Sequence, residues 1–346
     1  MVTFTLNIVN IQKDTPDVVT IFFKQPGLKK IKYLSGQYLT LVVRINNRKY
    51  IRPYSFSSAP NLDQHLAITI KRIPNGIVSN YLFDHVKVGD VIEVLPPMGD
   101  FIFHPDIHPS KHIMLWGAGS GITPLMSILK TALFNTSENV SLFYCNRNPE
   151  HTIFYNELCE LEAKYADRFK IHNFYTRIPE DVYLHYFIAG RIDEAKIVDI
   201  LSENTDLEHT VHYICGPDGL KQTVRNALST LNITQANIYT EEFEVFIDAQ
   251  QFDDVETREV KIVNSGVEHR IEVTKGTSIL NAALDHGIDM AYSCQTGTCM
   301  LCKGKLTSGK VKLIGIDKLP EGLDTGDCLL CCSYPYSNDI EILTIN

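Results

Sequence analysis

The chain has 346 residues, a length that predicts two or three domains because one ordinary core does not grow that large. Its 41 acidic and 32 basic side chains give a formal net charge of -9, which argues against a nucleic-acid-binding body, because such a body needs clustered Lys and Arg. We therefore expect small molecules and proteins as partners. The sequence lacks an uninterrupted run of about 18 apolar residues, the length typical of a membrane span, and its N-terminus lacks the pattern of a signal peptide, so we expect a cytoplasmic protein.

Residues 1–109 alternate between apolar and polar side chains with a period of two. Segments such as VTFTLNIV, VVTIFF, YLTLVV and LAITIKRI are separated by Gly, Pro and Asn turns. Short alternating segments between turn residues are typical of antiparallel strands. The sequence therefore predicts a small antiparallel β-barrel over residues 1–109.

One of these segments carries the motif RPYS, followed by FSS, at residues 52–58. It resembles the R-x-Y-S-x-S element of the ferredoxin–NADP reductase superfamily. The residue types suit a flavin: Arg52 for a phosphate oxygen, the Tyr54 ring against the isoalloxazine, and the Ser55 hydroxyl near flavin N5. On its own, the motif is also explained by an edge-strand turn with a surface arginine.

Three further segments match the same superfamily in the same order. They are GQY at residues 36–38, GIVSNYL at 76–82, where a turn and a helix N-terminus usually hold phosphate, and PMGDF at 97–101. The resemblance implies a flavin domain that binds FAD rather than FMN, although some relatives with this domain order use FMN. The residues that it implies for flavin binding are Arg52, Pro53, Tyr54, Ser55, Gly76, Val78 and Ser79.

The pattern changes at about residue 110, where strand-like runs such as HIMLWGAG and VSLFYC begin to alternate with helical ones such as TPLMSILKTALF. This alternation predicts a doubly wound parallel α/β domain over residues 110–243. The first strand enters GAGSGITP at residues 117–124, where glycines let a pyrophosphate approach backbone N–H groups at a helix N-terminus. The superfamily has GxGxGxTP at this point, which implies nucleotide binding by Gly117, Gly119, Gly121 and Thr123.

Two more segments match the superfamily, CGP at residues 215–217 and EEF at 241–243. The resemblance implies that Cys215 lies near the reacting nicotinamide carbon and that Glu241 lies at the flavin edge as a proton or orientation group. A buried thiol at a strand end would explain Cys215 equally simply. The expected catalytic set is Ser55, Cys215 and Glu241, with cofactor contacts from Gly216, Pro217 and Phe243.

Arg177 follows the third strand of this domain, where relatives that prefer NADPH place a hydroxyl and an arginine for the 2′-phosphate. Arg147 could assist it. An arginine on a solvated loop is the commonest alternative, so the sequence leaves NADPH and NADH open and predicts NAD(P)H.

Residues 244–257 are polar and weakly periodic, and we expect a linker there. A hairpin and a helix are predicted next. Cys294, Cys299 and Cys302 follow with C-x4-C-x2-C spacing, from which thiolates can converge on two irons while a distant fourth cysteine closes the site. Zinc sites usually pair two C-x2-C knuckles, and no matching partner knuckle is present, so an iron–sulfur cluster is favoured.

Residues 258–346 resemble the plant-type ferredoxin family, which implies a β-grasp fold and a [2Fe-2S] cluster. The family's C-terminal signature is similar to CLLCCSYP at residues 328–335 and implies Cys331 as the fourth ligand, although Cys328 and Cys332 depart from the usual residue types. If this segment is extended, Cys331 and Cys332 point to opposite sides, and only one can face the cluster. The implied ligands are Cys294, Cys299, Cys302 and Cys331.

The order of flavin, nicotinamide and ferredoxin domains resembles the reductase components of multicomponent oxygenases, of the phenylacetyl-CoA epoxidase reductase type. It implies an NAD(P)H-dependent oxidoreductase that passes electrons from NAD(P)H via FAD to the cluster and on to a partner oxygenase. A reductase for a desaturase or cytochrome, or a slow-turnover redox sensor, are the alternatives. Lysines after Cys302 predict docking on an acidic partner, or merely a solvated strand face: Lys303, Lys305, Lys310 and Lys312.

Overall fold

The computed structural model describes residues 2–27, 30–104, 112–177, 187–202, 206–245, 247–316 and 319–344. Thr3–Glu241 forms one compact unit, and Glu242–Asn346 belongs to a second. The expected boundary between residues 109 and 110 lies outside the described residues. Within the described ranges, no helix combines the length and the apolar character needed to cross a bilayer.

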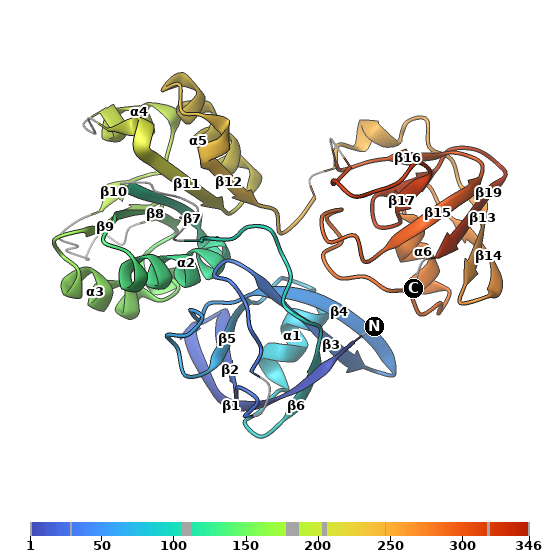
Figure 1. Cartoon of the computed structure of the whole chain (residues 1–346), viewed down its shortest axis with the longest axis horizontal. Coiled ribbons are helices and arrows are strands. Elements are labelled where there is room, and N and C mark those ends of the chain that lie inside the picture. Colours follow the sequence, from blue (N-terminus) through green and yellow to red (C-terminus); the bar gives the residue numbers. More distant parts are fainter. Residues whose placement is uncertain are drawn as a thin grey trace. The chain divides into compact units, whose positions relative to one another are not determined.

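Residues 4–94 form the predicted antiparallel barrel (Figure 1). Its sheet has the order β4-β3-β6-β1-β2-β5, and an isolated bridge between Phe56 and Ile68 connects the two ends of that order. Alternate side chains of the strands fill the interior, as period-two patterning requires. The strands are β1 (Phe4–Thr15), β2 (Val18–Phe23), β3 (Tyr38–Ile45), β4 (Arg48–Ser55), β5 (Leu66–Lys71) and β6 (Val91–Val94), with helix α1 (Ile77–Asp84) after β5.

The second half of this unit is a parallel sheet with the order β10-β9-β8-β7-β11-β12. Strand order reverses between β7 and β11, the switch point at which doubly wound sheets bind ligands. The strands are β7 (His112–Ala118), β8 (Asn139–Asn146), β9 (Phe169–Tyr175), β10 (Ile188–Ala189), β11 (Thr210–Cys215) and β12 (Ile238–Glu241). Helices α2 (Ile122–Asn135) and α3 (Tyr155–Lys164) cover one face, and α4 (Glu194–Ser202) and α5 (Asp218–Thr230) cover the other (Figure 1).

Aromatic contacts and hydrogen bonds join the barrel to the parallel-sheet domain. Phe101 and Phe103, at the end of the barrel segment, pack edge-on against Tyr213 of β11, with ring centroids 5.5 and 6.0 Å away. Tyr213 also donates a hydrogen bond to the carbonyl oxygen of Ile102 over 3.2 Å. On α2, the Ser127 hydroxyl donates to the carbonyl oxygen of Ser58, directly after the RPYS motif, over 2.6 Å. The flavin motif is therefore fixed relative to the nucleotide domain.

The second unit has a five-stranded sheet with the order β14-β13-β19-β15-β17, together with a two-stranded sheet of β16 and β18. Ser278 caps helix α6 (Ile279–Asp285) by accepting a hydrogen bond from the N–H of Asn281. The predicted hairpin is β13 (Arg258–Asn264) with β14 (Val267–Val273). The other strands are β15 (Lys303–Ser308), β16 (Val311–Leu313), β17 (Asp327–Leu329), β18 (Ser333–Pro335) and β19 (Ile340–Thr344). This is the expected β-grasp arrangement.

The segment 244–257, which we expected to be a linker, is partly folded. It contains a 3-10 turn, Ala249–Phe252, and Val255 is completely buried beside Ile314 and Tyr334. The Phe252 ring packs edge-on against that of Tyr334, with centroids 5.1 Å apart. Its few apolar side chains therefore attach this segment to the ferredoxin-like unit, a role that its mostly polar composition conceals.

Candidate active site

Three of the four segments of the expected flavin motif meet in the barrel. Tyr38 of β3 is paired with Ser55 of β4, and the N–H of Phe56 donates to the carbonyl of Gln37 over 3.0 Å. A Cβ atom built on Gly36 would lie 1.9 Å from the carbonyl oxygen of Phe101, and Gly36 has a φ of +97°. Only glycine allows this approach. Residues 36–38, 52–58 and 97–101 thus form one local structure around Ser55.

The side chains of the RPYS motif have different environments. Ser55 is buried, whereas Arg52 and Tyr54 are half-buried at the residue level. Burial raises the pKa of the Tyr54 phenol against the opposing charge of Arg52, so the phenol stays a hydrogen-bond donor at neutral pH. The motif therefore offers a cation, an aromatic hydroxyl and a buried hydroxyl along a single strand.

Helix α1 supplies the expected phosphate contact through its backbone. Its N-terminus has no side-chain cap and no acidic residue in its first turn, so N–H groups there are available to an anion. A Cβ atom on Gly76 would lie 2.6 Å from the Ser79 hydroxyl, and glycine therefore keeps this turn tight. The side chain of Val78 packs into the barrel core, so a cofactor contact of this residue would use its N–H.

The glycine-rich turn lies at the switch point of the parallel sheet. Gly119 adopts a positive φ of +52°, and Tyr144 donates a hydrogen bond to its carbonyl oxygen over 3.1 Å. The Thr123 hydroxyl, which is buried, donates to the carbonyl of Ser120 over 3.0 Å. Helix α2 begins here without a side-chain cap or an acidic residue in its first turn. The geometry fits a pyrophosphate on backbone N–H groups.

Three predicted residues form one row across neighbouring parallel strands. Cys215 of β11 pairs with Gly117 of β7 on one side and with Glu241 of β12 on the other. Carboxyl ends of parallel strands meet at one edge of the sheet, so the row places Glu241 and the Cys215-Gly216-Pro217 turn beside the glycine-rich loop. Phe243, two residues beyond Glu241, is 44% exposed and lies past the end of β12.

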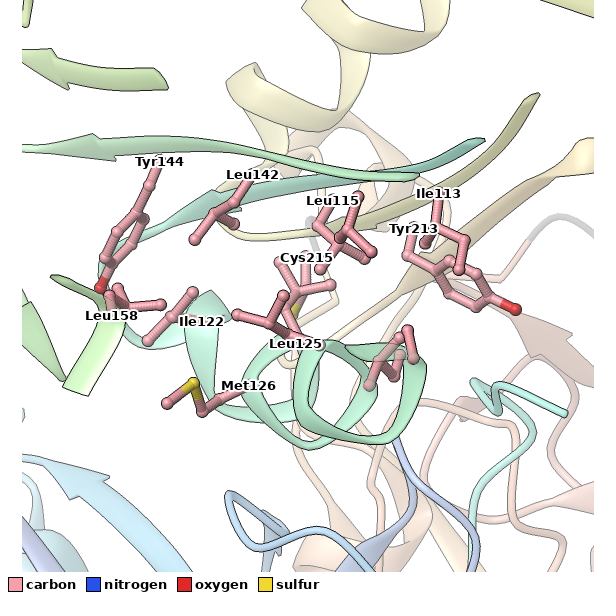
Figure 2. Close-up of a cluster of buried hydrophobic side chains, with 14 of the residues drawn as sticks. Ile113, Leu115, Ile122, Leu125, Met126, Leu142, Tyr144, Leu158, Tyr213 and Cys215 are labelled. Atoms are coloured by element: carbon pink, nitrogen blue, oxygen red, sulfur yellow. The ribbon is translucent and has the colours of Figure 1, made fainter. Parts of the chain in front are cut away.

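Cys215 itself is completely buried. Figure 2 shows its side chain between the sheet and α2, close to Leu125. This burial agrees with the simpler reading of a thiol at a strand end, and the structure does not expose the sulfur to a nucleotide. Cys215 contributes to the site through its backbone. Its carbonyl oxygen would lie only 2.1 Å from a Cβ atom built on Gly121, so the turn after β11 lies directly against the glycine-rich turn.

An open cavity of about 580 Å³ at the other end of this edge is lined by three arginines, Arg147, Arg177 and Arg191, with Thr176 and Gly190. Arg147 and Arg177 were expected from the sequence, and the N–H of Arg177 donates to the carbonyl of Arg147 over 2.7 Å. Arg191 was missed. It follows β10, a strand of only two residues, and the arginines thus come from the carboxyl ends of three adjacent strands, β8, β9 and β10.

The cysteine loop of the second unit holds its sulfur atoms in two pairs. The N–H groups of Thr296 and Cys299 each lie 3.4 Å from Cys294 Sγ. The pKa of Cys294 is lowered to about 4, first because the Cys299 thiol donates a hydrogen bond to it, then through Thr296 and these N–H groups. The side chain of Cys331, and then burial, raise the pKa of Cys302.

This pairing fits a two-iron cluster. Each pair, Cys294 with Cys299 and Cys302 with Cys331, offers two thiolates, the number that each iron of a [2Fe-2S] cluster needs. Gly297, with a φ of +81°, leaves room in the loop, because a Cβ atom there would lie 2.7 Å from Ile316.

One argument about the fourth ligand was wrong. Residues 330–332 form a turn rather than an extended segment, so Cys331 and Cys332 do not point to opposite sides. Their sulfur atoms lie 3.5 Å apart. The effect of Cys331 on the pKa of Cys302 still favours Cys331, whereas Cys328 donates to the carbonyl oxygen of Gly304 over 3.4 Å.

Known proteins share these domains in this order. Residues 5–103 match the oxidoreductase FAD-binding domain, residues 115–226 the oxidoreductase NAD-binding domain, and residues 262–336 the 2Fe-2S iron-sulfur cluster binding domain. The ferredoxin reductase component of 3-ketosteroid-9-alpha-monooxygenase from Mycobacterium tuberculosis is 32% identical, over 97% of this chain and 94% of that protein. The chain belongs to the oxygenase-reductase type of the ferredoxin–NADP reductase superfamily.

Other relatives of this reductase agree. A subunit of 1,2-phenylacetyl-CoA epoxidase from Escherichia coli is 29% identical, over 99% of this chain and 98% of that one. The solved structure of phthalate dioxygenase reductase has the same fold, with a TM-score of 0.70 and 23% identity, over 99% of this chain and 98% of the other. The reductase is therefore an NAD(P)H-dependent oxidoreductase with FAD and a [2Fe-2S] cluster. When bound, the flavin converts a two-electron donor into the one-electron steps that a cluster accepts.

Proposed function

We propose that this protein is the reductase component of a multicomponent oxygenase, and that it transfers electrons from NADPH through FAD and the cluster to that oxygenase. The proposal rests on one observation: a single chain carries the Ser55 motif, the row of Gly117, Cys215 and Glu241, and two cysteine pairs. Relatives along the whole chain are named as parts of oxygenase systems, which supports an oxygenase as acceptor. The oxygenated substrate would be bound by the partner.

Reduction by nucleotide tests the electron path. Purified protein should be brown-yellow and contain iron, and anaerobic NADPH should bleach the flavin and the cluster absorption. Rapid turnover with an artificial acceptor and product formation with an oxygenase component are expected. Zinc without iron would contradict the cluster, and slow turnover with every acceptor would favour the redox sensor instead.

We propose Ser55 and Glu241 as the groups that position or transfer protons at the flavin. Ser55 is buried next to Tyr38, and Glu241 ends the strand beside Cys215. A buried hydroxyl and a carboxylate are suited to hold a proton near a reacting nitrogen. For Cys215, the structure supports a role through the backbone of its turn. Cys215→Ala should therefore have the smaller effect, measured as the fold change in nucleotide affinity, and Glu241→Gln the larger one, measured as the fold change in turnover.

The arginine cavity supports NADPH over NADH. Three guanidinium groups from adjacent strand ends suit the two extra negative charges of a 2′-phosphate. Replacing Arg147, Arg177 or Arg191 by Gln should lower kcat/KM for NADPH roughly ten- to a hundredfold each, since a hydrogen bond to a charged group contributes about 1.5–3 kcal/mol. The value for NADH should change little.

Arg225→Gln is the matched control for this measurement, because Arg225 is an exposed arginine of the same domain on α5 and does not line the cavity. It should leave both values unchanged. Equal losses for NADPH and NADH in the three cavity variants would argue against discrimination at this place.

We also propose a cytoplasmic location. All nine cysteines are free thiols in the structure, and a reducing compartment keeps such thiols and a cluster intact. Fractionation of cells that express the protein should find it in the cytoplasm; recovery from an oxidising compartment would refute the proposal.

A further inference from the structure

Cys332 occupies an unusual place beside the fourth cysteine of the cluster loop. It is only 2% exposed, and its Sγ lies 3.5 Å from that of Cys331. A Cβ atom on Gly297 would lie 3.0 Å from Cys332 Sγ, so this sulfur faces the same loop that carries Cys294 and Cys299. The turn at residues 330–332 therefore directs the sulfur atoms of Cys331 and Cys332 towards the loop that carries Cys294 and Cys299.

The direction of a hydrogen bond between these two sulfur atoms follows from chemistry. Cysteine ligates iron as a thiolate, which has no proton to donate and only accepts. If Cys331 is a ligand, then Cys332 must be the donor over the 3.5 Å that separates them. Water does not compete for this thiol, because the side chain is almost completely buried.

We propose that the Cys332 thiol donates a hydrogen bond to the ligating sulfur of Cys331 and thereby raises the reduction potential of the [2Fe-2S] cluster. This inference rests on the ligand set of the proposed function. Reduction adds one negative charge to the cluster and its sulfur ligands, and a donor aimed at a ligating sulfur stabilises that charge. Cys332 acts through Cys331 and is a positioning residue, not a catalytic one.

The test is a redox titration of the full-length protein with chemical reductant, without nucleotide, followed by the electron paramagnetic resonance signal of the reduced cluster. Cys332→Val removes the donor at similar volume. We expect the ratio of oxidised to reduced cluster at a fixed potential to rise about tenfold, which lowers the midpoint by about 59 mV for one electron. Cys332→Ser keeps a donor and should restore most of the midpoint of the unmodified protein.

Cys328→Val is the matched control, because Cys328 is a buried cysteine of the same segment that bonds to Gly304 instead of a sulfur. Its midpoint should not change. As a second measurement, exchange into D2O should shift the Fe–S stretching bands less in Cys332→Val than in the unmodified protein. If Cys332→Val assembles no cluster, Cys332→Ala replaces it, since it removes the same donor without branched bulk.

An unchanged midpoint potential in Cys332→Val or Cys332→Ala would overturn the proposal. A midpoint potential of Cys332→Ser that falls as far as that of Cys332→Val would overturn it too. Iron that is lost from Cys332→Val but kept in Cys331→Ser would also overturn it, because Cys332 would then be the ligand. Failure of the proposed function is a separate outcome: it appears in the unmodified protein, as a flavin or cluster that NADPH does not reduce.

Discussion

Cys331 is the residue that we expect to be the fourth ligand of the cluster, because its side chain acts directly on the pKa of Cys302 in the cysteine loop. Cys331→Ser should lose most of the iron and the visible cluster absorption, because a serine hydroxyl is a poor substitute for a thiolate on iron. Flavin content and NAD(P)H-to-ferricyanide activity should remain largely intact, since those steps belong to residues 3–241.

Cys328→Ser and Cys332→Ser serve as controls for that variant and should keep the cluster. Iron content and visible spectra of the three purified variants decide the matter. If iron survives in Cys331→Ser and disappears in either neighbour, the ligand is assigned to the wrong cysteine.

His212 is a buried neutral histidine in the nucleotide domain. The Trp116 indole donates to its Nδ1 over 3.2 Å, which leaves the proton on Nε2, 2.8 Å from the Thr210 hydroxyl. Burial, and then the nearby charge of His112, lower its pKa to about 3. Because the unfolded histidine titrates near 6.5, its contribution to stability is complete above that pH and is lost as the pH falls towards 3.

The free energy of unfolding should therefore fall by about 2 kcal/mol from this residue between pH 7.5 and pH 5, at 1.36 kcal/mol per pKa unit. Denaturant titrations at the two pH values should show a smaller difference in His212→Gln, which has no such proton to take up. A magnetic resonance titration in which His212 protonates near pH 6.5 in the folded protein would contradict this.

For single residues, the sequence predicts the positions of those that one local motif brings together. Cys294, Cys299 and Cys302 lie within nine residues, so one loop must place them, and Arg147 and Arg177 each follow a long strand. Arg191 depends on a two-residue strand with no recognisable pattern. The position of Cys332 depends on a turn, whereas an extended segment with a period of two was assumed. The residue propensities in CLLCCSYP do not distinguish a turn from an extended segment.

Two backbone turns, Gly119–Gly121 and the one after β11, are in direct contact at the switch point. A Cβ atom on Gly121 would lie 2.1 Å from the carbonyl oxygen of Cys215 and 2.5 Å from its carbon. Gly121→Ala must therefore separate the two turns, which should cost about 1–3 kcal/mol or more in stability and abolish reduction by NAD(P)H. Thermal unfolding and stopped-flow flavin reduction measure the two effects.

Gly219→Ala provides the control in the same domain. Nothing lies within 4 Å of a Cβ atom there, and the residue is in helix α5, where alanine is favoured over glycine by up to about 1 kcal/mol. It should melt at the same or a higher temperature and be reduced normally. A Gly121→Ala protein that behaves like this control would show that the two turns are not tightly coupled.

Elements with strong periodicity are the ones that the sequence predicts well. The barrel strands, the parallel strands and the hairpin of β13 and β14 all carry patterns that a single segment reveals. The segment 244–257 does not, because its attachment depends on a few side chains, Phe252 and Val255 among them, whose partners lie some 60 to 80 residues away. Long-range burial of isolated apolar residues leaves no local signal.

For the whole molecule, the lysines after Cys302 bear on docking with the partner. Lys303 and Lys305 lie 3.4 and 3.5 Å from Asp327, and Lys312 lies 2.5 Å from Asp254, so much of this positive charge is matched within the protein. Reduction of the oxygenase should still slow as ionic strength rises, but by roughly tenfold or less, the low end of electrostatic steering. A small uncharged acceptor is the control. If the rate of oxygenase reduction does not change with ionic strength, electrostatic steering by these lysines is excluded.

The division of the chain at Glu241 and Glu242 has a kinetic meaning for the cell. One peptide bond joins the unit that accepts electrons from NAD(P)H to the unit that carries the cluster, and a short tether holds two modules at an effective concentration in the millimolar range. Electron delivery to the cluster is then first order and independent of how dilute the protein is. Only the last transfer, to a separate partner, depends on how many copies of each protein the cell makes.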